Sequence, residues 1–150
     1  MTWASRVRKI VERATAALPQ TTTGTLFTIS GGKVRIISIV GEVTTVIQTQ
    51  SNATKLIFNP TGTGSDVDLC ATLDITADAV GTLYSITGVV ATALKSTTLW
   101  AVLPADNIAA PGLILAPGTI QLNCAASNTG SVKWTIEYEQ LDMGGVVVAN

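Results

Sequence analysis

Two hydrophobic patterns divide the chain near residue 18. Before that point, apolar residues recur at alternating spacings of four and three, as Trp3, Val7, Ile10, Ala14 and Ala17. This spacing places them along one face of an α-helix. From Thr21 onward the helical period disappears and threonine becomes abundant, which favours β-strands because its side chain is β-branched. The pattern therefore predicts one helix followed by a β domain.

The predicted helix forms an amphipathic arm over residues 1–18. Thr2 is a suitable N-cap, and Pro19 ends the helix because the residue before a proline is pushed out of the helical region. Arg6, Lys9 and Arg13 fall on the face opposite the apolar stripe. A helix this short is marginal in water, so we expect it to lie on a surface. That surface is its own β domain, a neighbouring subunit, or a short three-stranded bundle of copies.

Nine later segments have the composition or alternation of strands, and turn residues (Gly, Pro, Asn, Asp) separate them. These segments are Thr25–Ser30, Val34–Val40, Val43–Gln50, Lys55–Phe58, Val67–Thr76, Leu83–Thr87, Leu99–Leu103, Thr119–Cys124 and Val132–Tyr138.

The clearest alternation lies near the C-terminus. Ile120 and Leu122 alternate with polar residues, and Trp134 lies within a second alternating run after a short Ser-Asn-Thr-Gly loop. We predict a β-hairpin here with one face in the core. The last residues, 144–150, are apolar apart from Asn150, so we expect them to add a strand to this domain or to a neighbour.

Many short strands without interleaved helices indicate an all-β fold. We predict an antiparallel β-sandwich or jelly-roll-like domain over residues 19–150, preceded by the N-terminal helix over residues 1–18.

Composition and charge limit the classes of function and partner that are expected for this chain. Hydrophobic residues make up 47% of the chain and charged residues only 13%, about half the usual share, so part of the surface is expected to face other protein. The formal net charge is −1, with +3 on residues 1–18 and −4 on the remainder, which favours neither nucleic acid nor a membrane as partner. No apolar run reaches the roughly 20 residues of a membrane span, and a secretory signal pattern is absent, so we expect synthesis in a cytoplasm.

The two cysteines are too few for a disulfide scaffold. Cys124 shares a face with Ile120 and Leu122, whereas Cys70 alternates with apolar neighbours. The alternation therefore predicts one buried and one exposed thiol. A bond between them needs the segment carrying Cys124 to cover the exposed face.

The chain has few of the groups that carry out catalysis. Histidine is absent, and two separated cysteines cannot complete a zinc site. Asp66, Asp68 and Asp74 share one predicted strand face, which leaves a metal or hydrolytic site open as an alternative, but the ordinary role is a solvated edge. Glu137 and Glu139 are expected to be solvated or paired across strands. We therefore expect no enzymatic activity, no cofactor and no metal.

The tryptophans offer a further alternative, because exposed aromatic faces stack on sugars. Trp134 and Trp100 lie within predicted strands and are expected to be core anchors. Trp3, in the helix stripe, is the best candidate for contact with another chain.

Two stretches carry a resemblance to a known group of proteins. One runs from Ala116-Pro117-Gly118-Thr119 through Asn128-Thr129-Gly130 to Leu141-Asp142 and the Gly/Val tail. The other includes Val40-Gly41-Glu42-Val43 and Ala79-Val80-Gly81-Thr82. Across roughly residues 30 to 148, the chain resembles small virion structural proteins of tailed bacteriophages.

The resemblance implies a capsid decoration, or cement, protein on the outside of the phage head. Its partners would be copies of itself, expected as a homotrimer, and the major capsid protein. A tail or head-fibre component that binds host glycans is the alternative. The resemblance implies no catalytic residues. From the residues themselves, the expected partner-binding set is Trp3, Arg6, Val7, Lys9, Ile10, Arg13, Val146, Val147 and Val148.

Overall fold

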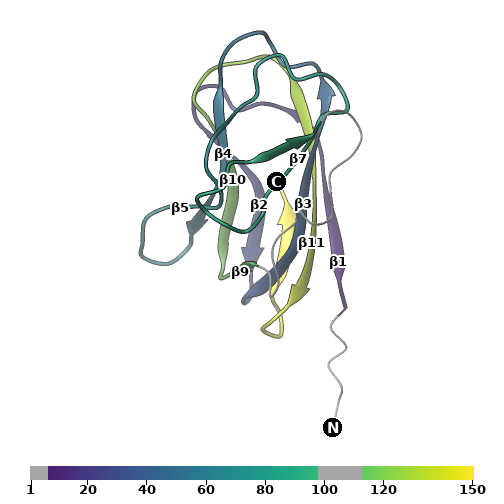
Figure 1. The fold of residues 1–150 in the computed structure, drawn as a ribbon. Coiled ribbons are helices and arrows are strands. Elements are labelled where there is room, and N and C mark those ends of the chain that lie inside the picture. The colour runs from purple at the N-terminus through teal and green to yellow at the C-terminus, as the bar shows by residue number, and fades with distance from the viewer. Residues whose placement is uncertain (1–6, 98–112) are drawn as a thin grey trace.

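The computed structural model of the chain describes residues 7–97 and 113–150, and every regular element in them is a β-strand (Figure 1). The strands are β1 (Lys9–Ala17), β2 (Thr23–Ser30), β3 (Val34–Thr45), β4 (Ala53–Pro60), β5 (Val67–Asp68), β6 (Leu73–Asp74), β7 (Leu83–Ser85), β8 (Lys95–Thr97), β9 (Leu113–Leu115), β10 (Gly118–Cys124), β11 (Ser131–Gln140) and β12 (Val146–Ala149). In these two ranges no helix is long and apolar enough to cross a membrane.

The strands form two six-stranded antiparallel sheets. Sheet A has the order β1-β11-β3-β7-β8, with β9 also paired to β3. Sheet B has the order β12-β2-β10-β4-β5, with β6 also paired to β4. Figure 1 shows the two layers edge-on, with β4, β10 and β2 in one and β3, β11 and β1 in the other. The all-β, sandwich-like class expected from the sequence is confirmed.

The expected N-terminal helix over residues 1–18 is wrong in the part that the structure describes, from residue 7 onward. Residues 9–17 form β1, which pairs antiparallel with β11 from Lys9 opposite Tyr138 to Ala17 opposite Ser131. An irregularity between Arg13 and Ala16 shifts the phase of the strand. Val11 and Leu18 therefore both contact the core, although they are seven residues apart. A strand with one such shift can have apolar spacings like those of a helix. Pairing with β11 also stabilises the backbone hydrogen bonds of this segment, whereas a short isolated helix is only marginally stable in water.

The predicted C-terminal hairpin is also wrong, although both of its strands exist. β10 lies in sheet B between β2 and β4, whereas β11 lies in sheet A between β1 and β3. Consecutive strands from β1 to β4 change sheet in the same way. Alternation shows that one face of a strand is buried, but strands that pair and strands that face each other across the core have the same alternation.

The largest differences from the expected strand boundaries lie in β3 and in the segment that contains β5 and β6. The segments Val34–Val40 and Val43–Gln50 merge into β3, because Gly41 continues the strand beneath the indole of Trp134. A Cβ atom at Gly41 would lie 2.8 Å from the ring carbons. The segment Val67–Thr76 is instead split into β5 and β6. The predicted strand Leu99–Leu103 lies outside the described residues.

The core fills the space between the sheets, and Trp134 is its largest fully buried side chain. Its ring stacks on Tyr84 with a centroid distance of 6.3 Å, so the expected role of Trp134 as a core anchor is confirmed. Cys70 and Cys124 are both free and both buried, which corrects the expectation of one exposed thiol. The short link between β5 and β6 folds inward, and the backbone N–H of Leu56 lies 3.3 Å from the Cys70 sulfur.

Candidate interaction surface

The two segments expected to bind partners lie next to each other at one side of the sandwich. β1 is the last strand of sheet A, and β12 is the last strand of sheet B. The Nε of Arg13 donates a hydrogen bond to the backbone oxygen of Asn150, 2.9 Å away. Asn150 is also held by its N–H, which donates to the carbonyl of Leu26. We call this surface, formed by residues 7–17 and 146–149, the β1/β12 side.

The expected partner-binding residues divide into exposed, internal and undescribed groups. Val7, Ile10 and Val148 have exposed fractions of 57%, 69% and 54%, and Lys9 is also exposed. Val147 is buried against the core, while Val146 and Arg13 are partly buried. Trp3 and Arg6 lie outside the described residues.

The C-terminal valines add a strand to their own domain. This was one of the two arrangements expected from the sequence, the other being a strand added to a neighbour. β12 pairs with β2, from Val146 opposite Ser30 to Ala149 opposite Phe27. Val147 points inward with Ile29, and Val148 points outward with Thr28. Arg13 has a structural role that the helical interpretation missed, because its guanidinium joins the edges of the two sheets. Partial burial lowers the pKa of this guanidinium from its ordinary value.

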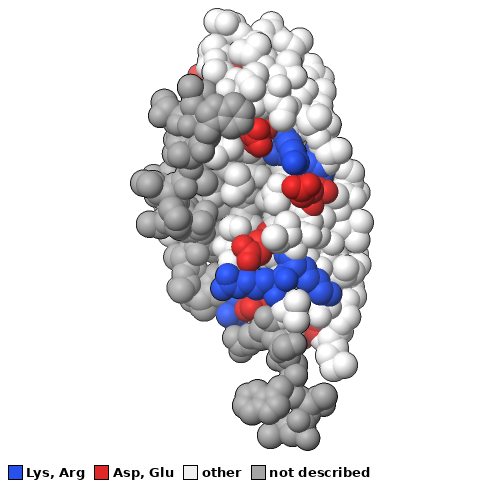
Figure 2. Space-filling view, turned by 90° about the vertical axis from the view of Figure 1, so that its right-hand side faces the viewer, with Lys and Arg blue, Asp and Glu red and all other residues white. Residues whose placement is uncertain are grey.

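The outer face of sheet A carries paired charges (Figure 2). Arg8 contacts Glu137 at 3.6 Å, and Lys133 contacts Glu12 at 3.4 Å. Arg35 contacts Glu139 at 3.4 Å farther along the sheet. Glu137 and Glu139, expected as solvated or cross-strand charges, thus each have a basic partner.

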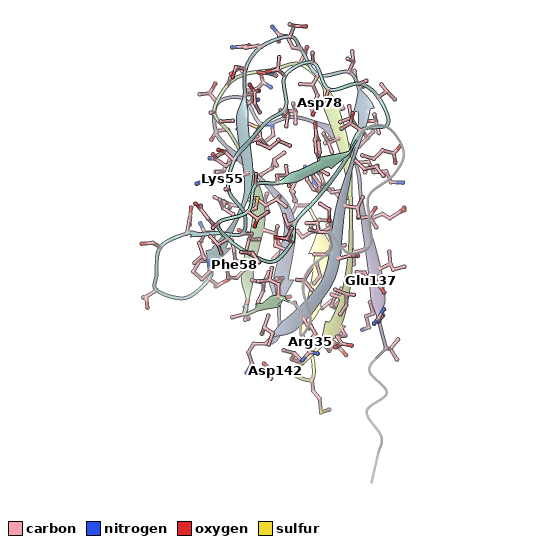
Figure 3. The ribbon with its side chains drawn as sticks, in the orientation of Figure 1. Arg35, Lys55, Phe58, Asp78, Glu137 and Asp142 are labelled. Carbon is pink, nitrogen blue, oxygen red and sulfur yellow. The ribbon has the colours of Figure 1, made fainter. Side chains whose placement is uncertain are left out.

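The outer face of sheet B is almost uncharged. Thr119, Gln121 and Asn123 face outward from β10 and lie opposite Thr28, Thr25 and Thr23 of β2. On β4, Lys55 forms an ion pair with Asp68 at 2.8 Å. Figure 3 shows Lys55 on the sheet B side of the molecule and Glu137 beside β1 on the other. The two faces therefore offer different contacts, one of paired charges and one of hydroxyls and amides.

Among the described residues, hollows open between the layers at two places considered below. One, of about 160 Å³, lies beside β1 and reaches Arg13, Leu18, Leu26 and Trp134. The other, of about 340 Å³, is mostly apolar and lies between β9 and the β4/β5 edge, where Phe58, Leu69 and Ile114 line it. The second hollow is large enough for an apolar side chain, and Asp68 is the charged residue among its described lining residues.

Of the three aspartates considered as a metal or hydrolytic site, Asp68 and Asp74 have structural partners, and Asp66 is exposed. Asp74 accepts hydrogen bonds from the hydroxyls of Ser51 and Thr76 and from the backbone N–H groups of Asn52 and Thr76. The Thr76, Asn52 and Ser51 donors hold the pKa of Asp74 well below its ordinary value. Asp68 is paired with Lys55, and the described ranges contain no group of three or more His, Cys, Asp or Glu side chains placed to hold a metal ion.

Burial favours the neutral forms of one tyrosine and of the two cysteines inside the sandwich. Burial raises the pKa of the Tyr84 hydroxyl, which also donates a 2.5 Å hydrogen bond to Asp78. Burial likewise raises the pKa values of the Cys70 and Cys124 thiols. Because the thiolate is the reactive form of cysteine, both side chains are unreactive core residues.

Two buried asparagines hold the loops at one end of the sandwich, and sequence reasoning missed both. The side-chain Nδ2 of Asn52 donates a hydrogen bond to the carbonyl of Ala126, and its Oδ1 accepts one from the backbone N–H of Ala126. The Asn128 amide donates to the carbonyls of Gln48 and Gln50. The only signal in the sequence was their place in turn-rich segments, where asparagine commonly bonds to backbone.

The fold and surface define a two-sheet antiparallel β-sandwich with an exposed side built from the edge strands β1 and β12. A scan against protein-family models, a search of curated proteins and a search of solved structures each found no match. The functional proposal therefore rests on the residues, the geometry and the resemblance stated above.

Proposed function

We propose that this chain is a non-enzymatic structural subunit of a tailed-bacteriophage particle, a decoration protein that binds the outside of the head as an oligomer and stabilises the shell. The observation that carries the proposal is the β1/β12 side, where the edge strands of the two sheets lie next to each other and Val7, Ile10 and Val148 are exposed. Edge strands and exposed apolar groups of this kind are sites of association with other protein.

The strand order supports this class of role. Without β6, β8, β9 and β12, the remaining eight strands have the order of a jelly roll, with β1-β11-β3-β7 in one sheet and β2-β10-β4-β5 in the other. Jelly rolls occur in viral capsid proteins and in lectins. A fold alone does not determine function, so the phage assignment itself depends on the sequence resemblance.

Shell binding is expected to use weak contacts repeated over several subunits, since avidity retains a multivalent ligand beyond the strength of each contact. On the β1/β12 side, Val148 supplies an apolar contact, and Lys9 supplies a positive charge for acidic groups on the major capsid protein. The protein is then made in the bacterial cytoplasm and located on the head exterior.

The alternative, a tail or fibre component that binds glycans, has less support. Sugar binding commonly uses exposed aromatic faces, and the described aromatic side chains are all buried. These are Phe27, Phe58, Tyr84, Trp134 and Tyr138. Copy number separates the two roles, because a decoration protein is present in hundreds of copies per particle and a tail or fibre protein in a handful.

The test is to add purified chain to phage heads that lack it, sediment the heads, and count bound copies by quantitative mass spectrometry and imaging. We expect hundreds of copies per head. Val148→Asp should reduce occupancy strongly, because it places a charge on the β1/β12 side. Val80→Asp is the matched control, since Val80 is also exposed but lies outside that side. Failure to bind heads, or a handful of copies at one vertex, would contradict the proposal.

Substitution is a cleaner test than removal of residues 1–18. Leu18 is buried in the core, and β1 covers the edge of β11. Deleting this segment would therefore damage the sandwich as well as the β1/β12 side.

A further inference from the structure

Within the described ranges, one edge of β1 is free of strand pairing. Among the strands that the structure describes, only β11 pairs with it, and its register is regular from Lys9 to Arg13. The side chains along this stretch are largely exposed. An edge of this length offers unpaired N–H and C=O groups that can pair with another strand.

The residues of this edge are arranged symmetrically about Ile10. Ile10 and Glu12 of β1 alternate with Arg8, which directly precedes the strand, and Ile10 lies opposite Glu137, the residue that Arg8 contacts. If a second copy pairs antiparallel with Ile10 opposite its own Ile10, Arg8 of each copy lies opposite Glu12 of the other. Directly opposite residues in such a pair are close enough for opposite charges to attract.

Other registers lose this match. A shift of one residue places outer side chains opposite inner ones, and a shift of two places Ile10 opposite a charged residue. In the symmetric register the inner face pairs Lys9 with Val11 and Val7 with Arg13, so no like charges lie directly opposite each other. The sequence of this edge is therefore complementary to itself in one register.

The charges are available for this contact. Arg8 and Glu12 each have a side-chain exposed fraction of 62%. Their partners within the chain, Glu137 and Lys133, both lie on β11, on the side away from the free edge. Pairing of two copies would join these ion pairs into a series of alternating acidic and basic side chains. Glu137 and Arg8 of one copy would be followed by Glu12 and Lys133 of the other. Figure 2 shows the acidic and basic groups of this face, and Figure 3 places Glu137 beside β1.

We infer that two copies of this chain associate through β1, in an antiparallel pair with Ile10 on the two-fold axis and two reciprocal Arg8–Glu12 ion pairs, so that sheet A continues across both copies. The inference deepens the self-association contained in the proposed function and rests on it. A two-fold contact is isologous and closes as a dimer. The expected trimer would need a different surface. The contact is short, so the dimer is expected to be weak in dilute solution and reinforced on a particle.

The first experiment is sedimentation velocity of the full chain over a hundredfold range of concentration. We expect a monomer–dimer equilibrium. Arg8→Glu and Glu12→Arg should each weaken it, by roughly tenfold or more, because like charges then meet twice across the axis. The double variant Arg8→Glu/Glu12→Arg should restore association close to that of the original chain.

The double variant separates contacts between copies from contacts within one copy. Both substitutions create repulsion inside the chain, against Glu137 and Lys133, so a purely internal effect would be largest in the double variant. Recovery in that variant is expected only if the residues meet across the axis. Circular dichroism confirms folding, and the exchange Lys55→Asp/Asp68→Lys on sheet B is the matched control, expected to leave association unchanged.

The second experiment is cross-linking. Ile10→Cys should form a disulfide between copies under mild oxidation, roughly tenfold faster than Val148→Cys, whose position is comparably exposed on β12. A monomer at all concentrations, equal cross-linking rates, or a trimer insensitive to both charge reversals would each overturn the inference. A chain that binds phage heads but fails these tests leaves the proposed function standing, whereas a β1 dimer that does not bind heads refutes only the proposed function.

Discussion

The interior of the sandwich and the β1/β12 side both contain valine and isoleucine side chains, but the two regions expose them to different degrees. Val147 and Val148 are neighbours on β12, but the first is 3% exposed and the second 54%. On β1, Val11 packs against the core while Ile10 faces solvent. Since side chains alternate along a strand, one apolar sequence supplies both a stabilising face and a contact face. Stability and association are therefore carried by different residues that can be changed separately.

The largest expected effect is at the centre of the interior. Trp134→Ala should lower the free energy of unfolding by about 3–5 kcal/mol, because it empties a site that is 1% exposed and lies between Gly41 and Tyr84. Urea denaturation followed by circular dichroism measures the loss. Trp134→Phe, which keeps an aromatic ring, should lose less. An alanine variant as stable as the original chain would show that the core is not organised around this residue.

A smaller effect should separate the two neighbouring valines. Val147→Ala is expected to cost about 2 kcal/mol, since it removes buried methyl groups. Val148→Ala should change the free energy of unfolding by no more than about 0.5 kcal/mol, because its side chain is already largely in water. The two variants differ only in the face they affect, so each is the control for the other. Equal costs measured by urea denaturation would mean that β12 is oriented differently.

The smallest expected effect concerns the dependence of stability on pH. It arises at the Asp74 turn, which belongs neither to the interior nor to the β1/β12 side. Hydrogen bonds from Thr76, Asn52 and Ser51 lower the pKa of Asp74 in the folded state below its ordinary value of 3.8. The stability that these bonds supply is present above that value and is lost as the pH falls through the folded pKa. Asp74→Asn should therefore lose less stability than the original chain when the pH is lowered from neutral to about 3.

Urea midpoints at the two pH values measure this difference. Asp66→Asn is the control, because it removes the same charge from a carboxylate that accepts none of those bonds. An acid dependence of Asp74→Asn identical to that of the original chain would show that the turn does not depend on the ionised carboxylate.

Several elements could be predicted from the sequence because their signal is local. The alternation in residues 119–124 and 132–138 predicted two strands with one buried face, and β10 and β11 have that form. Trp134 was predicted as a core residue from its phase alone. The all-β class followed from frequent turns and β-branched residues.

The prediction failed where the result depends on distant residues. The segment Lys9–Ala17 had a helical spacing, but its backbone pairs with β11, more than a hundred residues away in sequence. The candidate site also depends on residues that are distant in sequence. Its N-terminal and C-terminal halves were each proposed from composition, yet their adjacency depends on the sheet order and on the Arg13–Asn150 hydrogen bond.

The sequence by itself determined which residues can be buried, where turns occur, and that the chain lacks histidine and has few charges. Tertiary structure decided which strand lies beside which, that both cysteines are internal, and that β1 and β12 share one side. The physical reason is that hydrophobic alternation depends only on the local backbone period. Pairing depends on the free energy of the whole core and on hydrogen bonds between distant segments, which no short stretch of sequence contains.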